Sequence, residues 1–280
     1  MSETRIDNRF YKAEQVSENV WMISSCFVHM YLVVGKKRAA VVDTGYGFSS
    51  LYEFVRRITD KELFVILTHG HMDHIPGIRD FDCDIYMDHK DMETARRHTS
   101  REILERTFTA ARYERLVHPF RRQFRDGFQK EKYLDFALPE LLDIEDGQEF
   151  DLGGISLKIV ELPGHTPGSI GVLIPERMIL IEGDAVNEGI FLQLPESCRL
   201  DIYINTLYKA KALSFDTLLH GHTPPCGKER IEDYIHAAEN LDFAKGKLIK
   251  PNNMFCQEEI RECRDRKHRA KVVIAKSKLS

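Results

Sequence analysis

Residues 68–74, with the sequence Thr-His-Gly-His-Met-Asp-His, combine the side chains that are best suited to chemistry in this chain. Three imidazoles and one carboxylate fall within six positions, a density that packing alone does not explain. Neutral histidine nitrogen and aspartate oxygen are preferred ligands of borderline first-row metals such as zinc. His69 and His71 can face one ion while Asp73 and His74 face another. The stretch predicts a metal-binding loop rather than a polar turn whose histidines face solvent.

Apolar runs before this loop predict the strands that position it. Leu63–Leu67 is a continuous apolar run of a length that suits a buried strand, so the loop begins where a strand ends. From Val20 to Val42 the pattern is strand, turn, strand, repeated, which predicts a β-meander that ends at Asp43. Apolar residues at helical spacing predict a helix from Ser49 to about Thr59 between the meander and the strand.

Further ligand-type residues follow other predicted strands, each next to or near a glycine. His165 follows a strand from Ile155 to Leu162, and Asp184 follows a hairpin whose strands are Ser169 to Ile174 and Met178 to Ile181. After a helix from Asp201 to about Leu213, His222 follows a strand at Asp216–Leu219. Loops at strand ends commonly carry chemistry, and glycine lets the backbone pass close to a metal. Spacing alone does not show that these residues converge.

The sequence changes character from about Lys90 to Phe136, where it predicts a helical insertion. Apolar residues recur at helical spacing, and Pro119 should divide the segment into two helices. Lys90 to Lys132 holds twelve Lys or Arg against seven Asp or Glu in an otherwise acidic chain. One interpretation is a solvated helix face whose apolar side packs on the body. The other is a lid over the site or a homodimer contact, with arginines that meet an anionic part of the substrate.

Composition excludes several classes of function. The chain has 280 residues, 42% of them hydrophobic, with a net charge of -4, which does not favour binding to nucleic acid or membrane surfaces. Six cysteines lie scattered without a CxxC pair, as expected for reduced thiols in a cytosol. The first residues, 1–18, are polar and lack the apolar core of a secretory signal. We therefore predict a cytoplasmic protein that acts on a small molecule.

Five motifs together resemble the metallo-β-lactamase superfamily. Besides residues 68–74, they are Val-Asp-Thr-Gly at 42–45, Pro-Gly-His-Thr-Pro-Gly-Ser at 163–169, Gly-Asp at 183–184 and Gly-His at 221–222. The resemblance implies an α/β fold, an αββα sandwich of two mixed sheets packed face to face with the dinuclear site at one edge. It also implies a single domain of residues 1–280, with the insertion at about 90–136. From about 228 to 280 we expect a C-terminal helical extension that opens with a helix from Lys228 to Leu248, and one strand at Lys271–Ala275.

The resemblance also assigns the ligands. It implies two divalent metal ions, with zinc the first choice and iron or manganese as alternatives. The first ion is held by His69, His71 and His165; the second is held by Asp73, His74 and His222; Asp184 bridges them. Asp43 is expected to hydrogen-bond a ligand histidine rather than to bind metal. For His220 we prefer a structural role, and the remaining histidines have no supporting pattern: His29, His89, His98, His118, His236 and His268.

A hydrolytic mechanism follows from the implied pair of ions. Two adjacent cations lower the pKa of a bridging water from about 16 toward about 7, so hydroxide is available at neutral pH. Hydroxide then attacks a carbonyl or phosphorus, and Asp73 orients it or moves its proton. The predicted function is a metal-dependent hydrolase that cleaves an ester, thioester, lactone or phosphoester. Residues 163–169 resemble the glyoxalase II branch, although related hydrolases share this motif.

Other functions on the same fold are alternatives. A mononuclear iron oxidoreductase of the persulfide dioxygenase type shares the His-x-His-x-Asp-His pattern and is the runner-up. A flavodiiron protein is disfavoured because His71 stands where that group usually has glutamate. A nuclease is disfavoured by the acidic net charge, and a β-lactamase proper by the absence of a recognisable secretory signal.

Overall fold

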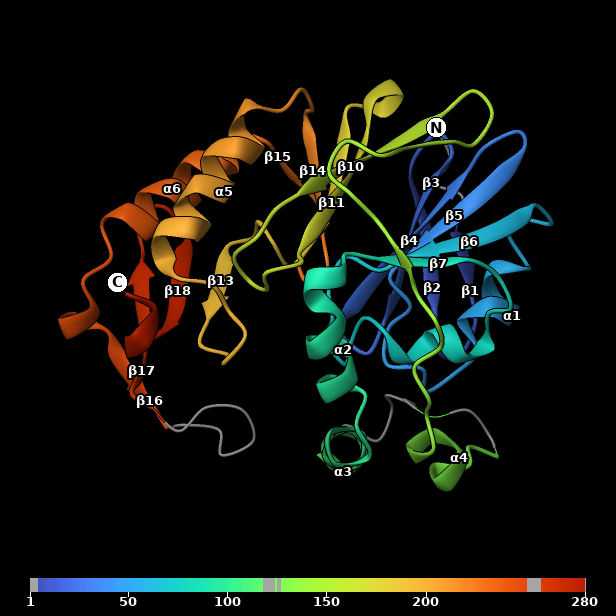
Figure 1. Cartoon of the computed structure of the whole chain (residues 1–280), viewed down its shortest axis with the longest axis horizontal. Coiled ribbons are helices and arrows are strands. Elements are labelled where there is room, and N and C mark those ends of the chain that lie inside the picture. The colour runs from blue at the N-terminus through green and yellow to red at the C-terminus, as the bar shows by residue number, and fades with distance from the viewer. Residues whose placement is uncertain (1–4, 118–123, 125–126, 251–257, 280) are drawn as a thin grey trace. The chain divides into compact units, whose positions relative to one another are not determined.

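The computed structural model describes residues 5–117, 124, 127–250 and 258–279 (Figure 1). The chain divides into two compact units, the first comprising Met1–Ile144 and Gln148–Leu157, the second Glu145–Gly147 and Lys158–Ser280. Each unit has its own apolar core, and the first unit is built on an eight-stranded sheet. The predicted metal ligands are therefore distributed over two separately built bodies.

An eight-stranded sheet forms the first unit, with its strands side by side in chain order. The first five strands pair antiparallel, and β5 to β8 pair parallel. The strands are β1 (Arg5–Asp7), β2 (Lys12–Ser17), β3 (Val20–Ser25), β4 (Val28–Val34), β5 (Arg38–Val42), β6 (Glu62–Ile66), β7 (Ile85–Met87) and β8 (Leu142–Asp143). The predicted meander and the predicted strand before the metal-binding loop are both confirmed.

Strands β5 and β6 are buried along almost their whole length. Four of the five residues of each strand are buried, which is the pattern of parallel strands covered on both faces. Helix α1 (Leu51–Val55) packs Leu51, Phe54 and Val55 into the same core. Ser50 caps α1 by accepting a hydrogen bond from the backbone N of Glu53 at 3.3 Å. The helix is shorter than predicted, because the chain turns tightly after Val55 with Ile58 bonded back to that residue.

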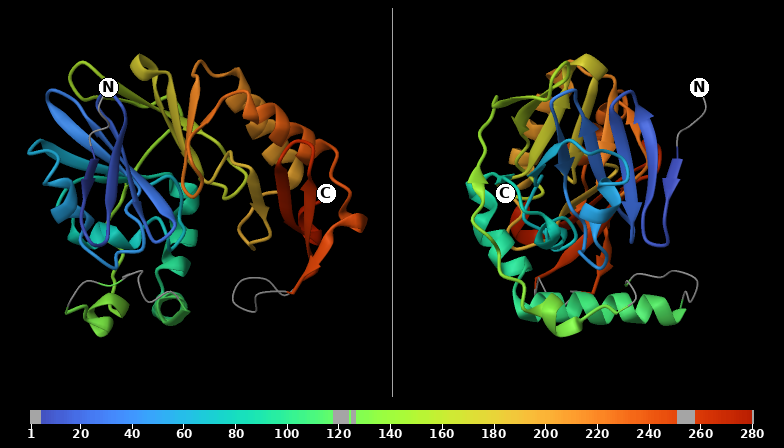
Figure 2. Two further views of the ribbon diagram at one scale, coloured as in Figure 1. Left: turned by 180° about the vertical axis from the view of Figure 1, so that it is seen from behind. Right: turned by 90° about the vertical axis from the view of Figure 1, so that its right-hand side faces the viewer.

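The insertion is helical, as predicted. It follows the 3-10 turn η1 (Pro76–Asp80) and comprises η2 (His89–Asp91), α2 (Met92–His98), α3 (Arg101–Val117) and α4 (Lys130–Leu134). Helix α3 is seen end-on in Figure 1 and lengthwise in the right-hand view of Figure 2. Leu104, Phe108 and Ala111 are buried in an aromatic cluster with Phe48. Tyr113, which helical spacing places on the same face, is exposed, and Pro119 lies outside the described residues.

Many basic side chains of the insertion form ion pairs within it. Arg101 contacts both Glu131 and Asp135, at 2.5 and 2.6 Å. Lys130 lies 2.6 Å from Glu105. These contacts join α3 to α4 and favour the solvated, self-paired face over a face whose arginines all point at a substrate.

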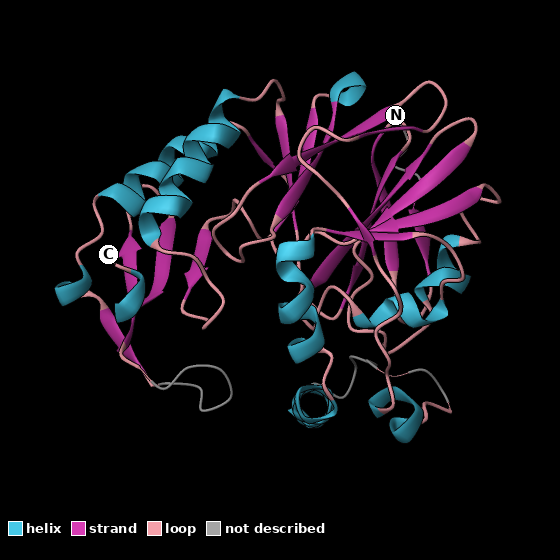
Figure 3. Cartoon of the chain, in the orientation of Figure 1, coloured by secondary structure: helices cyan, strands magenta, loops and turns pink. Residues whose placement is uncertain are grey.

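The second unit contains two sheets (Figure 3). One has the order β15, β14, β12, β11, β10, and the other the order β13, β18, β17, β16. Residues 148–157, with β9 (Glu149–Asp151), belong to the first unit and precede β10. The strands are β10 (Ser156–Glu161), β11 (Ile170–Ile174), β12 (Ile179–Gly183), β13 (Gly189–Leu192), β14 (Thr217–His220), β15 (Cys226–Gly227), β16 (Lys247–Ile249), β17 (Ile260–Asp265) and β18 (Ala270–Ala275). The predicted β11–β12 hairpin is confirmed, with the short turn η3 (Pro175–Arg177) between its strands.

Two helices share the core of the second unit. Helix α5 (Leu200–Ala212) buries Leu207, and α6 (Arg230–Glu239) buries Ile231 and Ile235. These side chains belong to one apolar cluster with Leu218 of β14 and Val272 of β18. In Figures 1 and 3 the two helices run next to each other beside β18.

The predicted C-terminal helix is wrong in its second half. Helix α6 ends at Glu239 rather than Leu248, and Asn240 caps it by donating its side-chain amide to the carbonyl of His236. The chain then forms η4 (Phe243–Lys245), strands β16 to β18 and η5 (Lys276–Lys278) instead of a helical extension. The strand predicted at Lys271–Ala275 is confirmed as β18.

Two further expectations concern membranes and thiols. Among the described residues, no helix has the length and apolar composition needed to cross a bilayer. The cysteines that the structure describes are free thiols, as the sequence predicts: Cys26, Cys83, Cys198, Cys226 and Cys263. Cys256 lies outside the described residues.

Candidate functional site

The metal-binding loop of the first unit begins directly after β6, and it packs against the N-terminal end of α2. The backbone N of Gly70 donates to Asp91 Oδ2 at 2.7 Å, and Asp91 is fully buried. A Cβ at position 70 would lie 2.8 Å from the backbone N of Ala95, so only glycine fits against the helix. The first helix of the insertion therefore positions the loop.

The carboxylate of Asp43, directly after β5, accepts three hydrogen bonds. The backbone N of Thr68 donates to Oδ1, and Thr68 Oγ1 donates to Oδ2, each at 2.8 Å. His74 Nδ1 lies 2.8 Å from the same Oδ2. Asp43 has a φ of 61°, a left-handed conformation that aspartate tolerates better than most residues. The prediction that Asp43 hydrogen-bonds a histidine of the ligand set is confirmed.

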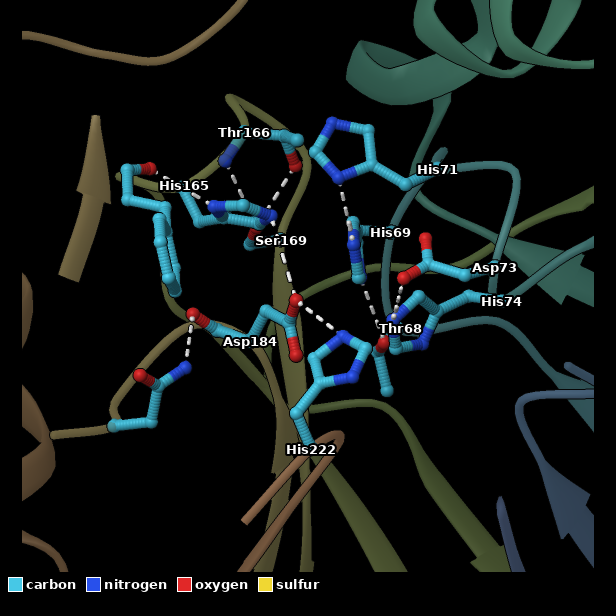
Figure 4. Close-up of polar contacts among 12 residues, drawn as sticks. Thr68, His69, His71, Asp73, His74, His165, Thr166, Ser169, Asp184 and His222 are labelled. Carbon is cyan, nitrogen blue, oxygen red and sulfur yellow. Dashed lines mark hydrogen bonds and ion pairs between the residues drawn. The ribbon is translucent and has the colours of Figure 1, made fainter. Parts of the chain in front are cut away.

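These bonds decide the proton positions on two imidazoles. Because the only hydroxyl proton of Thr68 goes to Asp43, Thr68 Oγ1 accepts from His69 Nδ1, 3.0 Å away. The lone pair of His69 is then on Nε2, which lies 3.1 Å from His71 Nδ1 (Figure 4). By the same reasoning His74 donates from Nδ1 to Asp43, and its lone pair is on Nε2. His69 Nε2 and His71 Nδ1, 3.1 Å apart, can therefore bind the same metal ion.

Asp73, the predicted catalytic residue, lies beside His74. Its Oδ2 is 3.8 Å from His74 Nε2, and its side chain is 15% exposed. The first unit thus brings together four of the predicted ligands: His69, His71, Asp73 and His74.

Three predicted ligands come together in the second unit. Parallel pairing of β12 with β14 places Asp184 and His222 at one sheet edge, where the backbone N of Gly221 donates to the carbonyl of Gly183 at 2.6 Å. Asp184 Oδ2 lies 3.1 Å from His222 Nε2 and 3.7 Å from His165 Nε2 (Figure 4). One carboxylate oxygen therefore faces two imidazole nitrogens, the arrangement expected of a metal-binding carboxylate.

Neighbouring backbone orients His165. Its Nδ1 donates to the carbonyl of Phe191 in β13 at 3.0 Å, which leaves the lone pair on Nε2, the nitrogen that faces Asp184. The loop itself is closed by Ser169, whose Oγ accepts from the backbone N of Thr166 at 3.1 Å. The imidazole is thus held in one tautomer before any metal binds.

His220 has the structural contacts that the sequence predicts. Its Nδ1 lies 2.6 Å from Glu182 Oε1, and its Nε2 lies 3.1 Å from Cys226 Sγ. Burial raises the pKa of Glu182 to about 7. Burial lowers the pKa of His220, but hydrogen bonds to Cys226 and Glu182 outweigh that effect and raise it to about 10. The pair therefore keeps a proton above neutral pH and fixes the strand ends that carry Asp184 and His222.

Sequence reasoning missed the contribution of α2. The His98 ring stacks on that of His71 with centroids 4.4 Å apart, and its Nδ1 lies 3.4 Å from Met72 Sδ. Asp91 and His98 are seven residues apart, a spacing that places both on one side of a helix. That spacing was the available signal, but only the tertiary contact with Gly70 and His71 gives it meaning.

The geometry defines a class of protein before any comparison: an α/β protein with two histidine and carboxylate groups suited to divalent metals. Residues 24–222 match the Metallo-beta-lactamase superfamily. The chain belongs to this superfamily, whose members bind divalent metals, so the family and fold predictions are confirmed.

Individual relatives refine this assignment. The chain is 28% identical over 242 residues to the acyl-coenzyme A thioesterase MBLAC2 of Homo sapiens, with 81% of this chain and 80% of the relative covered. It is 27% identical over 154 residues to the hydroxyacylglutathione hydrolase GloC of Haemophilus influenzae, with 55% and 64% covered. A solved metallo-beta-lactamase family protein from Thermus thermophilus shares the fold, with a TM-score of 0.57, 18% identity and 80% of each chain covered. Together these relatives support a metal-dependent hydrolase.

Proposed function

We propose that this protein is a dinuclear metal-dependent hydrolase that cleaves thioesters, and that its two ligand groups form one centre. His69, His71 and His165 would hold one divalent ion. Asp73, His74 and His222 would hold the other, with Asp184 between them. Zinc suits this set of imidazoles and carboxylates best.

One observation supports the proposal above all. Hydrogen bonds to Thr68 Oγ1, Asp43 Oδ2 and the Phe191 carbonyl place the ring proton of three predicted ligands on Nδ1. The three ligands so fixed are His69, His74 and His165. Histidines that bind a metal usually donate their other ring N–H to such a partner, which fixes the orientation of the imidazole. The three imidazoles therefore fit the predicted ions.

The chain's own residues would divide the reaction between them. Bound ions would supply Lewis acidity, which makes water a nucleophile near neutral pH. Asp73 would orient the attacking water and accept its proton, and Asp43 would hold His74 in place. The thioester carbon–sulfur bond breaks, water supplies the hydroxyl of the carboxylic acid, and the thiol leaves with a proton. No serine or cysteine nucleophile is required.

The thioester assignment rests on the relatives. An acyl-coenzyme A and a hydroxyacylglutathione are both acyl thioesters, and these are the substrates that the two relatives' names state. We propose a small-molecule substrate with an anionic part, because the coenzyme A and glutathione portions of the relatives' substrates carry ionised acidic groups. Cytoplasmic localisation and a homodimer also stay predictions.

A substrate panel with matched variants tests the function. The purified protein, loaded with zinc, is assayed for release of thiol from acyl-coenzyme A and acylglutathione, and for hydrolysis of a lactone and a phosphodiester. We expect thiol release to dominate and His71→Ala to lose both metal and turnover while it stays folded. His89→Ala is the control, since His89 is 66% exposed on η2.

Two results would contradict the proposal. Unchanged metal content in His71→Ala would remove that residue from the ligand set. Iron in the purified protein, together with oxygen uptake that depends on a persulfide, would replace hydrolysis by the oxidoreductase alternative.

A further inference from the structure

A third group of metal-type ligands lies in the second unit, outside the predicted centre. It consists of His236 on α6, Asp265 at the end of β17 and His268 in the turn before β18. One donor atom of each residue lies within 4.8 Å of the other two. The Nδ1 atoms of both imidazoles lie 2.8 Å from the same oxygen, Asp265 Oδ2. The ring centroids are 3.9 Å apart.

The local fold holds these three side chains in place. Asp265 Oδ1 accepts hydrogen bonds from the backbone N of Lys267 and of His268, each at 3.1 Å, which turns Oδ2 toward the imidazoles. On α6, Arg230 donates to the carbonyls of His268 and Arg269, each at 3.2 Å. The hydrogen bonds of Arg230 therefore hold the turn against the helix independently of the three ligand side chains.

Partial burial and charge suit a cation. The side chains of Asp265 and His268 are 17% and 19% exposed, and that of His236 is 47% exposed. The hydrogen bond from His268 is the main cause that holds the pKa of Asp265 far below its usual range, so this carboxyl stays anionic. A cavity of about 730 Å³, lined by His236 and Asp265, adjoins the group and admits water as a further ligand.

A carboxylate oxygen between two imidazole nitrogens also occurs elsewhere in this unit, there with Nε2 rather than Nδ1 atoms. Asp184 Oδ2 also faces two imidazole nitrogens, at 3.1 and 3.7 Å. Zinc lies about 2.0–2.2 Å from nitrogen and oxygen ligands, so tetrahedral donors are about 3.4 Å apart. The 2.8 Å separations at Asp265 would need to widen by about half an ångström, which side-chain rotation allows.

We propose that a divalent ion, zinc in the first place, replaces the two Nδ1 protons that Asp265 Oδ2 accepts, so that His236 Nδ1, His268 Nδ1 and Asp265 Oδ2 bind it while each imidazole keeps a proton on Nε2. This structural site is separate from the hydrolytic centre. The ion would join α6 to the β17–β18 turn and leave turnover unchanged. Its position on secondary structure that carries no predicted catalytic ligand makes the two sites separable by mutation.

Zinc content tests the site. Wild-type protein, His268→Ala and the control Lys267→Ala, which alters an exposed residue of the same turn, are equilibrated with zinc and their bound metal is counted. We expect His268→Ala to bind one zinc ion fewer per chain and to hydrolyse substrate at the wild-type rate, with Lys267→Ala unchanged in both. Equal zinc content in wild type and His268→Ala overturns the proposal.

Thermal unfolding separates a metal site from a set of hydrogen bonds. If zinc binds here, the loss of melting temperature in His268→Ala is larger in zinc than in a chelator, because only wild type gains the binding energy. An equal loss in both conditions means that the histidine acts through hydrogen bonds alone and contradicts the site. Should His268→Ala fail to fold, Asp265→Asn keeps an acceptor oxygen but removes the charge, and it must also lose one zinc ion.

Discussion

Asp43 is not a predicted metal ligand, yet its hydrogen bonds orient two residues that are. Its Oδ1 accepts from the backbone of the metal-binding loop, and its Oδ2 accepts from Thr68 and His74. Through Thr68 it also fixes the tautomer of His69. One buried carboxylate thus orients two imidazoles that are predicted to serve different ions.

Replacing Asp43 should therefore weaken metal binding more than folding. In Asp43→Asn the side-chain NH₂ would replace either Oδ1, which accepts from the backbone N of Thr68, or Oδ2, which accepts from Thr68 Oγ1 and His74, so at least one bond is lost. We expect metal affinity and kcat/KM to fall roughly 10- to 100-fold. Metal titration and steady-state kinetics measure both quantities. Asp60→Asn, at an exposed position, is the control, and an equal effect there would count against this role.

Local pattern predicted some of the site residues but not their support. Asp43 could be proposed because a carboxylate at a strand end next to glycine is recognisable in the sequence and matches the family motif. Asp91 and His98 could not, because nothing between residues 91 and 98 indicates that Gly70 will lie against this turn. Their role depends on a tertiary contact, which spacing does not encode.

Helix α2 and helix α3 contribute differently to the first unit, although both belong to the insertion. Helix α2 lies against the metal-binding loop, through the bond from Gly70 to Asp91 and the stacking of His98 on His71. Helix α3 instead buries Leu104 and Phe108 in the aromatic cluster with Phe48. Within the insertion, α2 contacts the metal-binding loop and α3 packs on the aromatic cluster, so each helix can be altered without the other.

Deletion of residues 101–128, with a short flexible replacement, should change substrate range more than metal binding. The deletion removes α3 but leaves α2 and its contacts with the loop. We expect metal content to be retained and the ratio of turnover between long and short acyl thioesters to shift. The panel assay and metal analysis measure the two effects.

The outcome distinguishes the two interpretations of the insertion. Equal turnover across the panel before and after deletion would remove the lid and leave only a packed, self-paired helix. Loss of metal would instead show that α3 supports the loop indirectly, and an Asp91→Ala variant, which removes the acceptor of the Gly70 bond directly, would serve as the reference.

The sequence predicts the strands whose own residues are apolar and buried. It does not predict strands that are stabilised mainly by hydrogen bonds to neighbouring strands. Apolar residues fill β4 to β6, so their own composition identifies them. Strand β17 reads Ile-Arg-Glu-Cys-Arg-Asp and has only one buried residue; its ladder to β18 and β16 stabilises it rather than its own hydrophobicity. For the same reason the helical pattern after Lys228 was extended too far, since the charged residues beyond Glu239 fit either structure.

At the scale of the whole chain, the predicted ligands are split between two units with separate cores. Four lie in the first unit and three in the second, and within each unit they already face one another. The superfamily fold supplies the reason to expect that both groups serve one pair of ions. Such a centre would make metal binding a property of the two units together.

Adding metal to the metal-free protein should therefore protect both units from amide hydrogen exchange. We expect slower exchange in residues 68–74 and in residues 163–168, 182–187 and 220–222, because a shared pair of ions restrains every loop that supplies a ligand. Ligand that binds only the folded state adds about 2.7 kcal/mol to the free energy of unfolding at a free concentration of about 100 Kd. Asp184→Asn, altered in the second unit alone, should weaken protection of residues 68–74 in the first. Protection that stays within one unit, or that survives in the first unit of this variant, would mean that each group binds metal by itself and that the dinuclear centre does not form.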